Sequence, residues 1–343
     1  MTATPLNPLV SMGMPVFNGT GKMARAVDSL LAQTYANFEL VISDNCSTDG
    51  TWDLCQEYAR RDNRVRISRN HENIGIVPNF KRVLALASGK YFMWTAVDDF
   101  WKPHFVETLV REMEGHPETG IALCAFELVR PDHSPHKTYN LPLKHRPNGR
   151  GRLATALSCY TPAKMNYYMY GLFQREFVLG QIDHLAAMNA ADRRFVTKLA
   201  LLKPLRYVDQ ALHVRTNNTS IPIQKRYPGD SSVKPLANRS SAVINIRPFT
   251  TVAGFVLHCR HIPLIRKALY LPPLFLWYSA YQFSLIHLRL RQGLQRLRQS
   301  LFSRGNGSRR VAAGNMSNEN GHGSSSVGGD APCTQRQGRT PCR

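Results

Sequence analysis

The first hundred residues alternate between short apolar runs and segments with helical spacing. Apolar runs lie at 9–16, 38–43, 65–68 and 91–97, and polar loops and helix-period segments separate them. Strands that alternate with helices at this spacing predict an α/β domain with a mostly parallel central sheet. In open sheets of this kind ligands bind beyond the carboxyl ends of the strands, so we expect the functional site at that edge.

The segments that follow these runs carry the candidate site residues. A helix is expected at 77–87, ending at Ser88-Gly89 as its C-cap. The residues that fall beyond the carboxyl ends of the strands are Pro15, Val16, Phe17, Asp44, Arg69, Asp98 and Asp99. This grouping predicts one shared site at the strand ends.

Asp98 and Asp99 close the fourth apolar run, in Trp-Thr-Ala-Val-Asp-Asp-Phe-Trp. Adjacent carboxylates repel each other unless a cation lies nearby. Mg²⁺ or Mn²⁺ would relieve the repulsion and could also bind the diphosphate of a nucleotide. A solvated Asp-Asp turn is the alternative, and only the wider pattern decides between them.

Several further blocks occur in a fixed order along the chain. They are Met14–Gly19 (MPVFNG), Ser29–Tyr35 (SLLAQTY), Glu39–Thr51 (ELVISDNCSTDGT), Asn73–Gly75 (NIG), Ala87–Tyr91 (ASGKY) and Asp98-Asp99. In sequence and spacing these blocks resemble the family 2 glycosyltransferases, over about residues 8–220. The resemblance identifies a family and leaves the substrate open.

The resemblance implies a GT-A fold, in which a single α/β domain binds a nucleotide-sugar. It also implies roles for six residues: Pro15 and Phe17 line the base pocket, Asp44 hydrogen-bonds the base, Arg69 contacts the nucleotide, Asp98 lies near the ribose, and Asp99 coordinates Mn²⁺ or Mg²⁺. Many members carry a further aspartate where this chain has Ala96. This chain therefore offers fewer carboxylates to a metal.

Inverting transfer needs a base that takes the proton of the acceptor hydroxyl. By the same resemblance this carboxylate opens a later helix, and Asp192 in Ala190–Phe195 is the candidate. The alternative is an aspartate favoured in a first helical turn by the helix dipole. Asp183 is the second candidate for the base. Arg215 resembles part of a closing Arg-x-His element in which Asn217 replaces the histidine, and is a candidate for binding phosphate.

The chain carries 44 Lys and Arg residues against 23 Asp and Glu, a formal charge of +21. Eleven of the basic residues and none of the acidic ones lie between 247 and 310. Such an excess indicates a polyanionic partner, either nucleic acid or an anionic membrane surface. The aromatic residues there are not interleaved with the basic ones, which favours lipid, so we expect no nucleic-acid partner.

The C-terminal segment allows three structures. Residues 268–288 are uncharged and long enough to cross a bilayer, to lie in its surface, or to form a core helix pair. Residues 288–301 predict a basic amphipathic helix suited to anionic lipid. We therefore expect a GT-A domain at 1–230, a basic helical membrane-associating segment at 231–302, and a disordered tail at 303–343.

The remaining motifs bear on location. Seven scattered cysteines without a Cys-x-x-Cys pair predict free thiols, and the N-terminus lacks a signal-peptide pattern. Gly19-Thr20-Gly21-Lys22 lacks the spacing of a phosphate loop. These features predict a cytoplasmic protein, peripheral to the inner face of the cell membrane.

The functional expectation is transfer of a hexose or deoxyhexose from a UDP-, dTDP- or GDP-sugar. The acceptor would be a hydroxyl of a lipid-linked or cell-envelope glycan. One alternative is a catalytically silent scaffold of the same fold that binds nucleotide-sugar at the membrane. The other is a nucleic-acid-binding protein that depends on the basic C-terminus.

Overall fold

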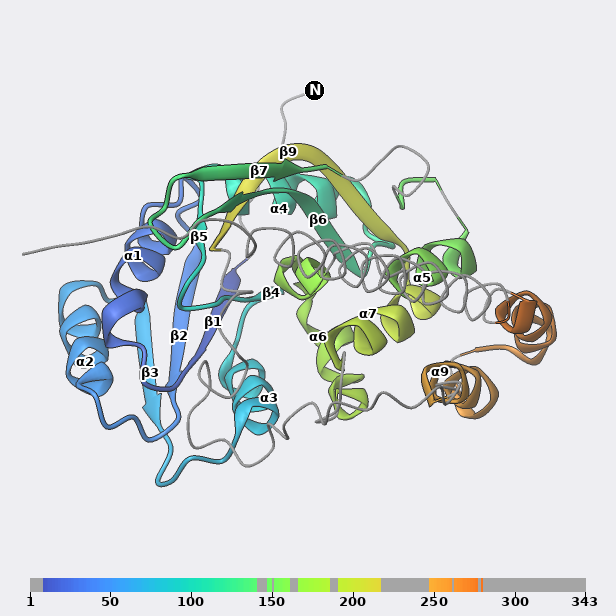
Figure 1. Ribbon diagram of the computed structural model, residues 1–343, viewed down its shortest axis with the longest axis horizontal. Coiled ribbons are helices and arrows are strands. Elements are labelled where there is room, and N and C mark those ends of the chain that lie inside the picture. Colours follow the sequence, from blue (N-terminus) through green and yellow to red (C-terminus); the bar gives the residue numbers. More distant parts are fainter. Residues whose placement is uncertain are drawn as a thin grey trace, which may run out of the picture. The chain divides into compact units, whose positions relative to one another are not determined.

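The fold is a curled α/β sheet flanked by helices (Figure 1). The computed structural model describes residues 9–140, 147–149, 151–160, 166–185, 191–216, 247–260, 262–276 and 279. By contacts within the chain, all of these described residues belong to one compact unit, which spans 1–280. The predicted domain boundary near residue 230 lies outside the described residues.

The sheet has the strand order β3-β2-β1-β4-β8-β6-β9-β5, with β7 beside β6. Its strands are β1 (Val10–Val16), β2 (Phe38–Asp44), β3 (Val65–Arg69), β4 (Tyr91–Trp94), β5 (Phe100–Trp101), β6 (Ile121–Val129), β7 (Pro135–Tyr139), β8 (Leu172–Gln174) and β9 (Leu205–Thr216). The pairs among β3, β2, β1 and β4 are parallel, as is β6 with β9, while β8, β7 and β5 join antiparallel.

Helices connect and cover these strands. They are α1 (Thr20–Leu31), α2 (Thr51–Arg61), α3 (Ile76–Leu86), α4 (Phe105–Gly115), α5 (Arg152–Tyr160), α6 (Arg175–Leu179), α7 (Ala191–Leu202) and α9 (Arg247–His258), with the 3-10 turns η2 (Asn166–Tyr170) and η3 (Ile182–His184). The predicted alternation of strand and helix is thus confirmed through β4. Between β6 and η2 the chain adds strand β7 and helix α5.

The parallel register brings three strand ends into one row. Val16 of β1 pairs with Asp44 of β2, and Asp44 pairs with Arg69 of β3. The side chains that follow these strands therefore start from a common edge, as the sequence predicted.

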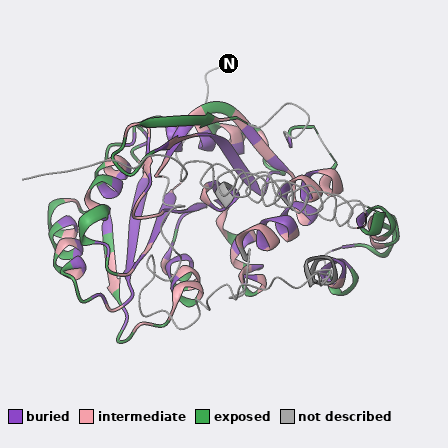
Figure 2. Ribbon diagram, in the orientation of Figure 1, coloured by how far each residue is buried: buried purple, intermediate pink, exposed green. Residues whose placement is uncertain are grey.

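Alternating side chains of the strands enter two hydrophobic cores, one on each face of the sheet. On β4, Tyr91 and Met93 belong to one core, while Phe92 and Trp94 belong to the other. This separation follows from the two-residue period of a strand. Figure 2 shows β1 and β2 buried along most of their length, whereas β7 is exposed.

Trp94 organises the core on its face. Its ring meets Phe92 and Phe173 edge to face, with centroids 4.8 and 5.2 Å away, and its Nε1 donates to the carbonyl of Phe80 at 3.0 Å. Trp94 and Trp101 are both buried. The tryptophans that flank the Asp-Asp pair are therefore core residues.

The structure corrects two expected boundaries. β4 ends at Trp94 rather than Val97, so a turn separates the strand from Asp98 and Asp99. Gly89 does not form a left-handed C-cap, because α3 ends at Leu86 and its C-cap residue, Ala87, is extended. Its role is close approach: a Cβ there would lie 2.6 Å from the carbonyl oxygen of Leu9 and 2.8 Å from the nitrogen of Ser11.

The C-terminal part is described only to residue 279. Residues 264–276 form a helix that begins after Pro263. Among the described residues, every helix is too short or too polar to span a bilayer. The amphipathic helix predicted at 288–301 and the tail predicted at 303–343 lie outside the described residues.

We expect Gly89→Ala to destabilise the fold by about 2 kcal/mol, because the added methyl group would press on β1 backbone that cannot move away. Gly115→Ala is the matched control, since a Cβ at Gly115 would meet nothing within 4 Å. Urea unfolding should show the loss for the first variant only. Equal stability of the two variants would contradict the close-approach role.

Candidate functional site

A pocket opens at the carboxyl ends of β1 and β4. It contains about 920 Å³ of space not filled by protein atoms, part of which is open to solvent. Its walls come from the loops after β1, β2, β3 and β4, from α1 and α3, and from η2. The lining residues are Pro15, Val16, Phe17, Asn18, Lys22, Asn45, Asn73, Ile76, Asn79, Phe80, Thr95, Ala96, Val97, Asp98 and Tyr170.

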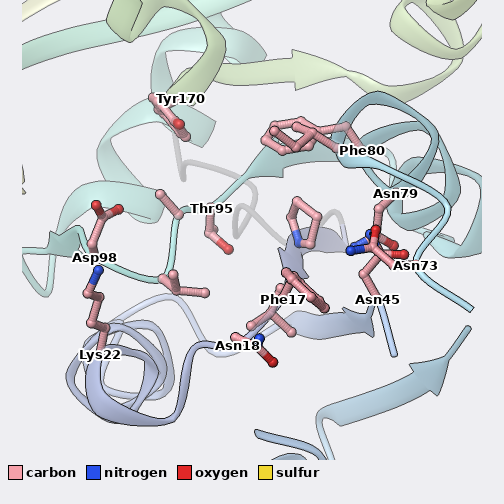
Figure 3. A pocket seen from close by; sticks show the side chains of 15 residues that line it. Phe17, Asn18, Lys22, Asn45, Asn73, Asn79, Phe80, Thr95, Asp98 and Tyr170 are labelled. Carbon is pink, nitrogen blue, oxygen red and sulfur yellow. The ribbon is translucent and has the colours of Figure 1, made fainter. Parts of the chain in front are cut away.

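The two ends of the pocket differ in chemistry. Figure 3 shows Asn45, Asn73 and Asn79 together at one end and Asp98 with Lys22 at the other. The rings of Phe17 and Phe80 lie on the side of the asparagines. One end therefore suits an uncharged aromatic ring with polar edges, and the other suits a charged group.

Hydrogen bonds hold the asparagine end in place. Nδ2 of Asn45 donates to Oδ1 of Asn73 at 2.7 Å, and the nitrogen of Gly75 donates to the same oxygen at 3.0 Å. Oδ1 of Asn79 accepts from Oγ of Ser43 at 2.7 Å. These bonds orient Oδ1 of Asn73 toward Asn45, so Nδ2 of Asn73 points away from Asn45. The pocket presents an ordered amide edge there.

Asp44 and Arg69 lie beside this end, outside the pocket lining. Asp44 is fully buried and accepts from the backbone nitrogen of Ser47, and its Oδ2 lies 3.2 Å from Nε of Arg69. Arg69 also donates from Nη2 to the Ser47 carbonyl at 2.9 Å. The ion pair anchors the loop that carries Asn45 into the pocket.

The side chain of Asp99 lies away from the pocket that Asp98 lines, and it contacts the end of β9. β5 pairs antiparallel with β9, and this pairing sets Asp99 beside the end of β9. Its Oδ2 is 3.1 Å from Nε2 of His213 and 3.4 Å from Nε of Arg215, and its Oδ1 accepts from the nitrogen of Thr216 at 3.2 Å. His213 in turn stacks on the ring of Trp101.

Electrostatics keep Asp99 ionised. Burial alone would raise its pKa, but the charge of Arg215 and the hydrogen bonds from His213 and Thr216 hold the pKa below its usual value. Burial lowers the pKa of His213, against the pull of Asp99. Asp99 is therefore a buried anion whose partners belong to the protein.

The described residues contain no cluster of three or more His, Cys, Asp or Glu side chains that could hold a metal. Of the two adjacent carboxylates, Asp98 lines the pocket and Asp99 does not. A divalent cation bound through one or two carboxylates takes its other ligands from substrate phosphates and water. Asp98 fits such a role, with the ligand of the pocket supplying the rest.

Asp192 opens α7, which contacts the turn η2 that carries Tyr170. Burial raises its pKa, while the charges of Arg193 and Arg215 oppose the rise. Asp183, the second candidate, is 98% exposed and pairs with Lys81 at 3.2 Å. Of the two carboxylates, only Asp192 has the partly buried setting of a base tuned toward neutral pH.

The sequence interpretation placed Pro15, Phe17 and Asp98 where the structure has them, in the pocket. It assigned no role to Lys22, to the neighbours Asn79 and Phe80, or to Tyr170, which come from three separate parts of the chain. His213 had a readable signal: it precedes Arg215 by two residues, so both side chains lie on one face of β9.

Asp99→Asn should destabilise the protein by about 2 kcal/mol, because it leaves Arg215 without its buried counter-charge. Arg215→Met should restore part of that loss when combined with Asp99→Asn. The measurement is a double-mutant cycle from urea unfolding. Losses that simply add would show that the pair is not coupled.

The model of the family described as "Glycosyl transferase family 2" matches residues 11–178. TuaG of Bacillus subtilis, a glycosyltransferase named for teichuronic acid biosynthesis, is 33% identical over 126 residues, which cover 37% of this chain and 48% of TuaG. WcaA of Escherichia coli, named for colanic acid biosynthesis, is 37% identical over 100 residues, covering 29% of this chain and 35% of WcaA.

The matched part spans between about a third and a half of the length of such relatives. Among solved structures, residues 1–349 of TarS from Staphylococcus aureus superpose with a TM-score of 0.56 at 16% identity, covering 80% of this chain and 72% of TarS. At this identity the likeness is one of fold, and it confirms the expected GT-A architecture.

Proposed function

Because this chain belongs to glycosyltransferase family 2 through residues 11–178, we propose that it transfers a sugar from a nucleoside-diphosphate sugar to a hydroxyl group, with inversion at the anomeric carbon. The observation that carries the proposal is the two-ended pocket, with aromatic rings and amides at one end and Asp98 with Lys22 at the other. A nucleoside diphosphate has the same division between base and phosphates.

The base of the donor would lie by Phe17 and Phe80, with its polar edge toward Asn45 and Asn73. The diphosphate would lie at the other end, where the ammonium group of Lys22 attracts it. Asp98 would hold a divalent cation there, and such a cation stabilises the charge that develops on the departing nucleotide. Asp99 would act through position, since its contacts fix the turn that directs Asp98 to the pocket.

Asp192 would take the proton of the acceptor hydroxyl as that oxygen attacks the anomeric carbon and the bond to the diphosphate breaks. Its raised pKa improves its match to a hydroxyl proton at neutral pH. Arg215 links the two sides of the site, because its charge acts on Asp99, Asp98 and Asp192.

The acceptor would be a lipid-linked or cell-envelope glycan, with the protein peripheral to the inner face of the cell membrane. TuaG and WcaA are named for teichuronic acid and colanic acid biosynthesis, and these names support a cell-envelope glycan as the acceptor. The basic excess from 247 to 310 supports an anionic membrane as a partner.

Asp98→Asn should weaken binding of UDP, dTDP or GDP, whichever binds best, by about ten-fold in the presence of Mn²⁺, because the cation loses its protein carboxylate. Isothermal titration with and without Mn²⁺ measures this. Asp53→Asn removes the same charge from the exposed surface of α2 and should leave the affinity unchanged. If none of the three nucleotides binds the unaltered protein, the donor assignment fails.

Asp192→Asn should lower the turnover number by about 10²- to 10⁴-fold while donor binding is retained, because the base is lost and the pocket is not. In the unaltered protein, activity should rise with pH as Asp192 loses its proton, and this step should lie above the usual aspartate pKa since burial raises it.

The matched control is Asp183→Asn, which alters an exposed carboxylate and should keep its activity. Turnover is measured as nucleotide release with a glycan acceptor. A large loss in Asp183→Asn together with full activity in Asp192→Asn would reverse the assignment of the base.

A further inference from the structure

A second cavity lies between α7 and α9, apart from the donor pocket. It contains about 370 Å³ of space not filled by protein atoms, part of which is open to solvent, and it is lined by His184, Lys198, Phe255, His258 and Cys259. Phe255 is buried, and its ring meets His184 edge to face at 4.9 Å and Lys198 at 5.3 Å. The aromatic ring thus holds a histidine and a lysine at the cavity wall.

Among the residues that the structure describes, the lining of this cavity includes one lysine and two histidines and no carboxylate. Burial, and then the neighbouring charge of Arg194, lowers the pKa of Lys198. Burial and then Lys198 lower the pKa of His184. Asp183, the acidic group that acts on His184, is 98% exposed and paired with Lys81. Burying the ammonium group of Lys198 without an anion beside it costs free energy, and a bound anion would offset that cost while the histidine rings could donate hydrogen bonds to it.

An exposed apolar surface continues from the same helix. Seven large hydrophobic side chains are exposed in the described part of the chain. All of them except Ile74 lie on α9 or on the helix at 264–276. They are Leu257, Leu264, Ile265, Leu269, Phe275 and Leu276, with exposures from 50% to 83%. Figure 2 shows the outer of these two C-terminal helices as largely exposed.

Basic residues accompany this surface. Arg260 and Arg266 are exposed, and Lys267 donates from Nζ to the carbonyl of Leu257 at 2.7 Å. No acidic residue occurs between 247 and 310. Apolar side chains together with arginine and lysine suit the surface of an anionic bilayer, where the former enter the acyl boundary and the latter meet phosphates.

We propose that the helix at 264–276 lies in the surface of an anionic bilayer and that the cavity of His184, Lys198 and His258 binds the phosphate group of a lipid in that bilayer. The exposed apolar surface favours a lipid as the ligand, because a soluble phosphate would leave those apolar side chains in water. The cavity supplies the recognition of the phosphate group itself.

The inference rests on the proposed function in one respect, the choice of acceptor. Lys198 follows Asp192 by six residues on α7, which is about 9 Å along a helix axis. A phosphate in the cavity would then place the glycan of a lipid-linked acceptor near the proposed base. A lipid-linked acceptor is thus the class of acceptor that would engage both the cavity, through its phosphate, and Asp192, through its glycan hydroxyl.

The test is binding of the full chain to vesicles of phosphatidylcholine alone and of phosphatidylcholine with phosphatidylglycerol. Binding should require the anionic lipid. Lys198→Gln should weaken it by about five-fold, the effect of one lysine at an anionic surface. Lys203→Gln, five residues on and outside the cavity lining, is the matched control and should change the affinity by less than about two-fold. Leu264→Glu with Ile265→Glu should abolish binding.

Equal losses in Lys198→Gln and Lys203→Gln would overturn the cavity assignment in favour of diffuse attraction. Inorganic phosphate that binds the unaltered protein as well as the vesicles do would identify a soluble ligand instead, and tight binding of duplex DNA in place of vesicles would identify a nucleic acid. Nucleotide titrations of the same variants should match the unaltered protein, so failure at the membrane is distinct from failure of the donor site.

Discussion

The buried ion pair between Asp99 and Arg215 is the interaction on which the site depends. It joins the turn after β4 to the end of β9, strands that lie more than a hundred residues apart in the chain. His213 and Thr216 complete the set of donors to Asp99. Because Asp99 is held this way, Asp98 is directed into the pocket. The same arginine acts on Asp192, so one cation couples the donor side to the proposed acceptor side.

The sheet explains why chemically different groups meet in one pocket. Parallel register aligns the ends of β1, β2 and β3, while β4 lies on the other side of β1. The loop after β1 therefore lies between two groups of side chains. Asn45 and Asn73, which follow β2 and β3, lie on one side, and Asp98, which follows β4, lies on the other. An aromatic and amide end next to a charged end is the result. The second cavity, between α7 and α9, likewise places chemically different groups side by side: lysine and histidine side chains lie next to an exposed apolar surface.

The strands and helices through β4 could be predicted from periodicity, because each is defined by side chains a few residues apart. The limits of that reasoning are visible at particular residues. Gly89 looked like a helix cap, yet it is small because β1 passes close to it. Trp94 stands next to an acidic motif, yet its ring packs against Phe173 and Phe92. Sequence spacing does not report contacts of this kind, since they depend on how distant segments pack.

By itself the sequence determined the α/β class, the edge of the sheet at which the site lies, and the placement of Pro15, Phe17 and Asp98 there. Local hydrophobic period and the order of motifs were sufficient for that. Only the tertiary structure decided which of two adjacent carboxylates faces the pocket and which is neutralised by Arg215. It also decided that Lys22 and Phe80 share that pocket, and that His184 and Lys198 share another. The physical reason is that burial and charge pairing are properties of residues brought together by folding, and neighbours in the chain do not reveal them.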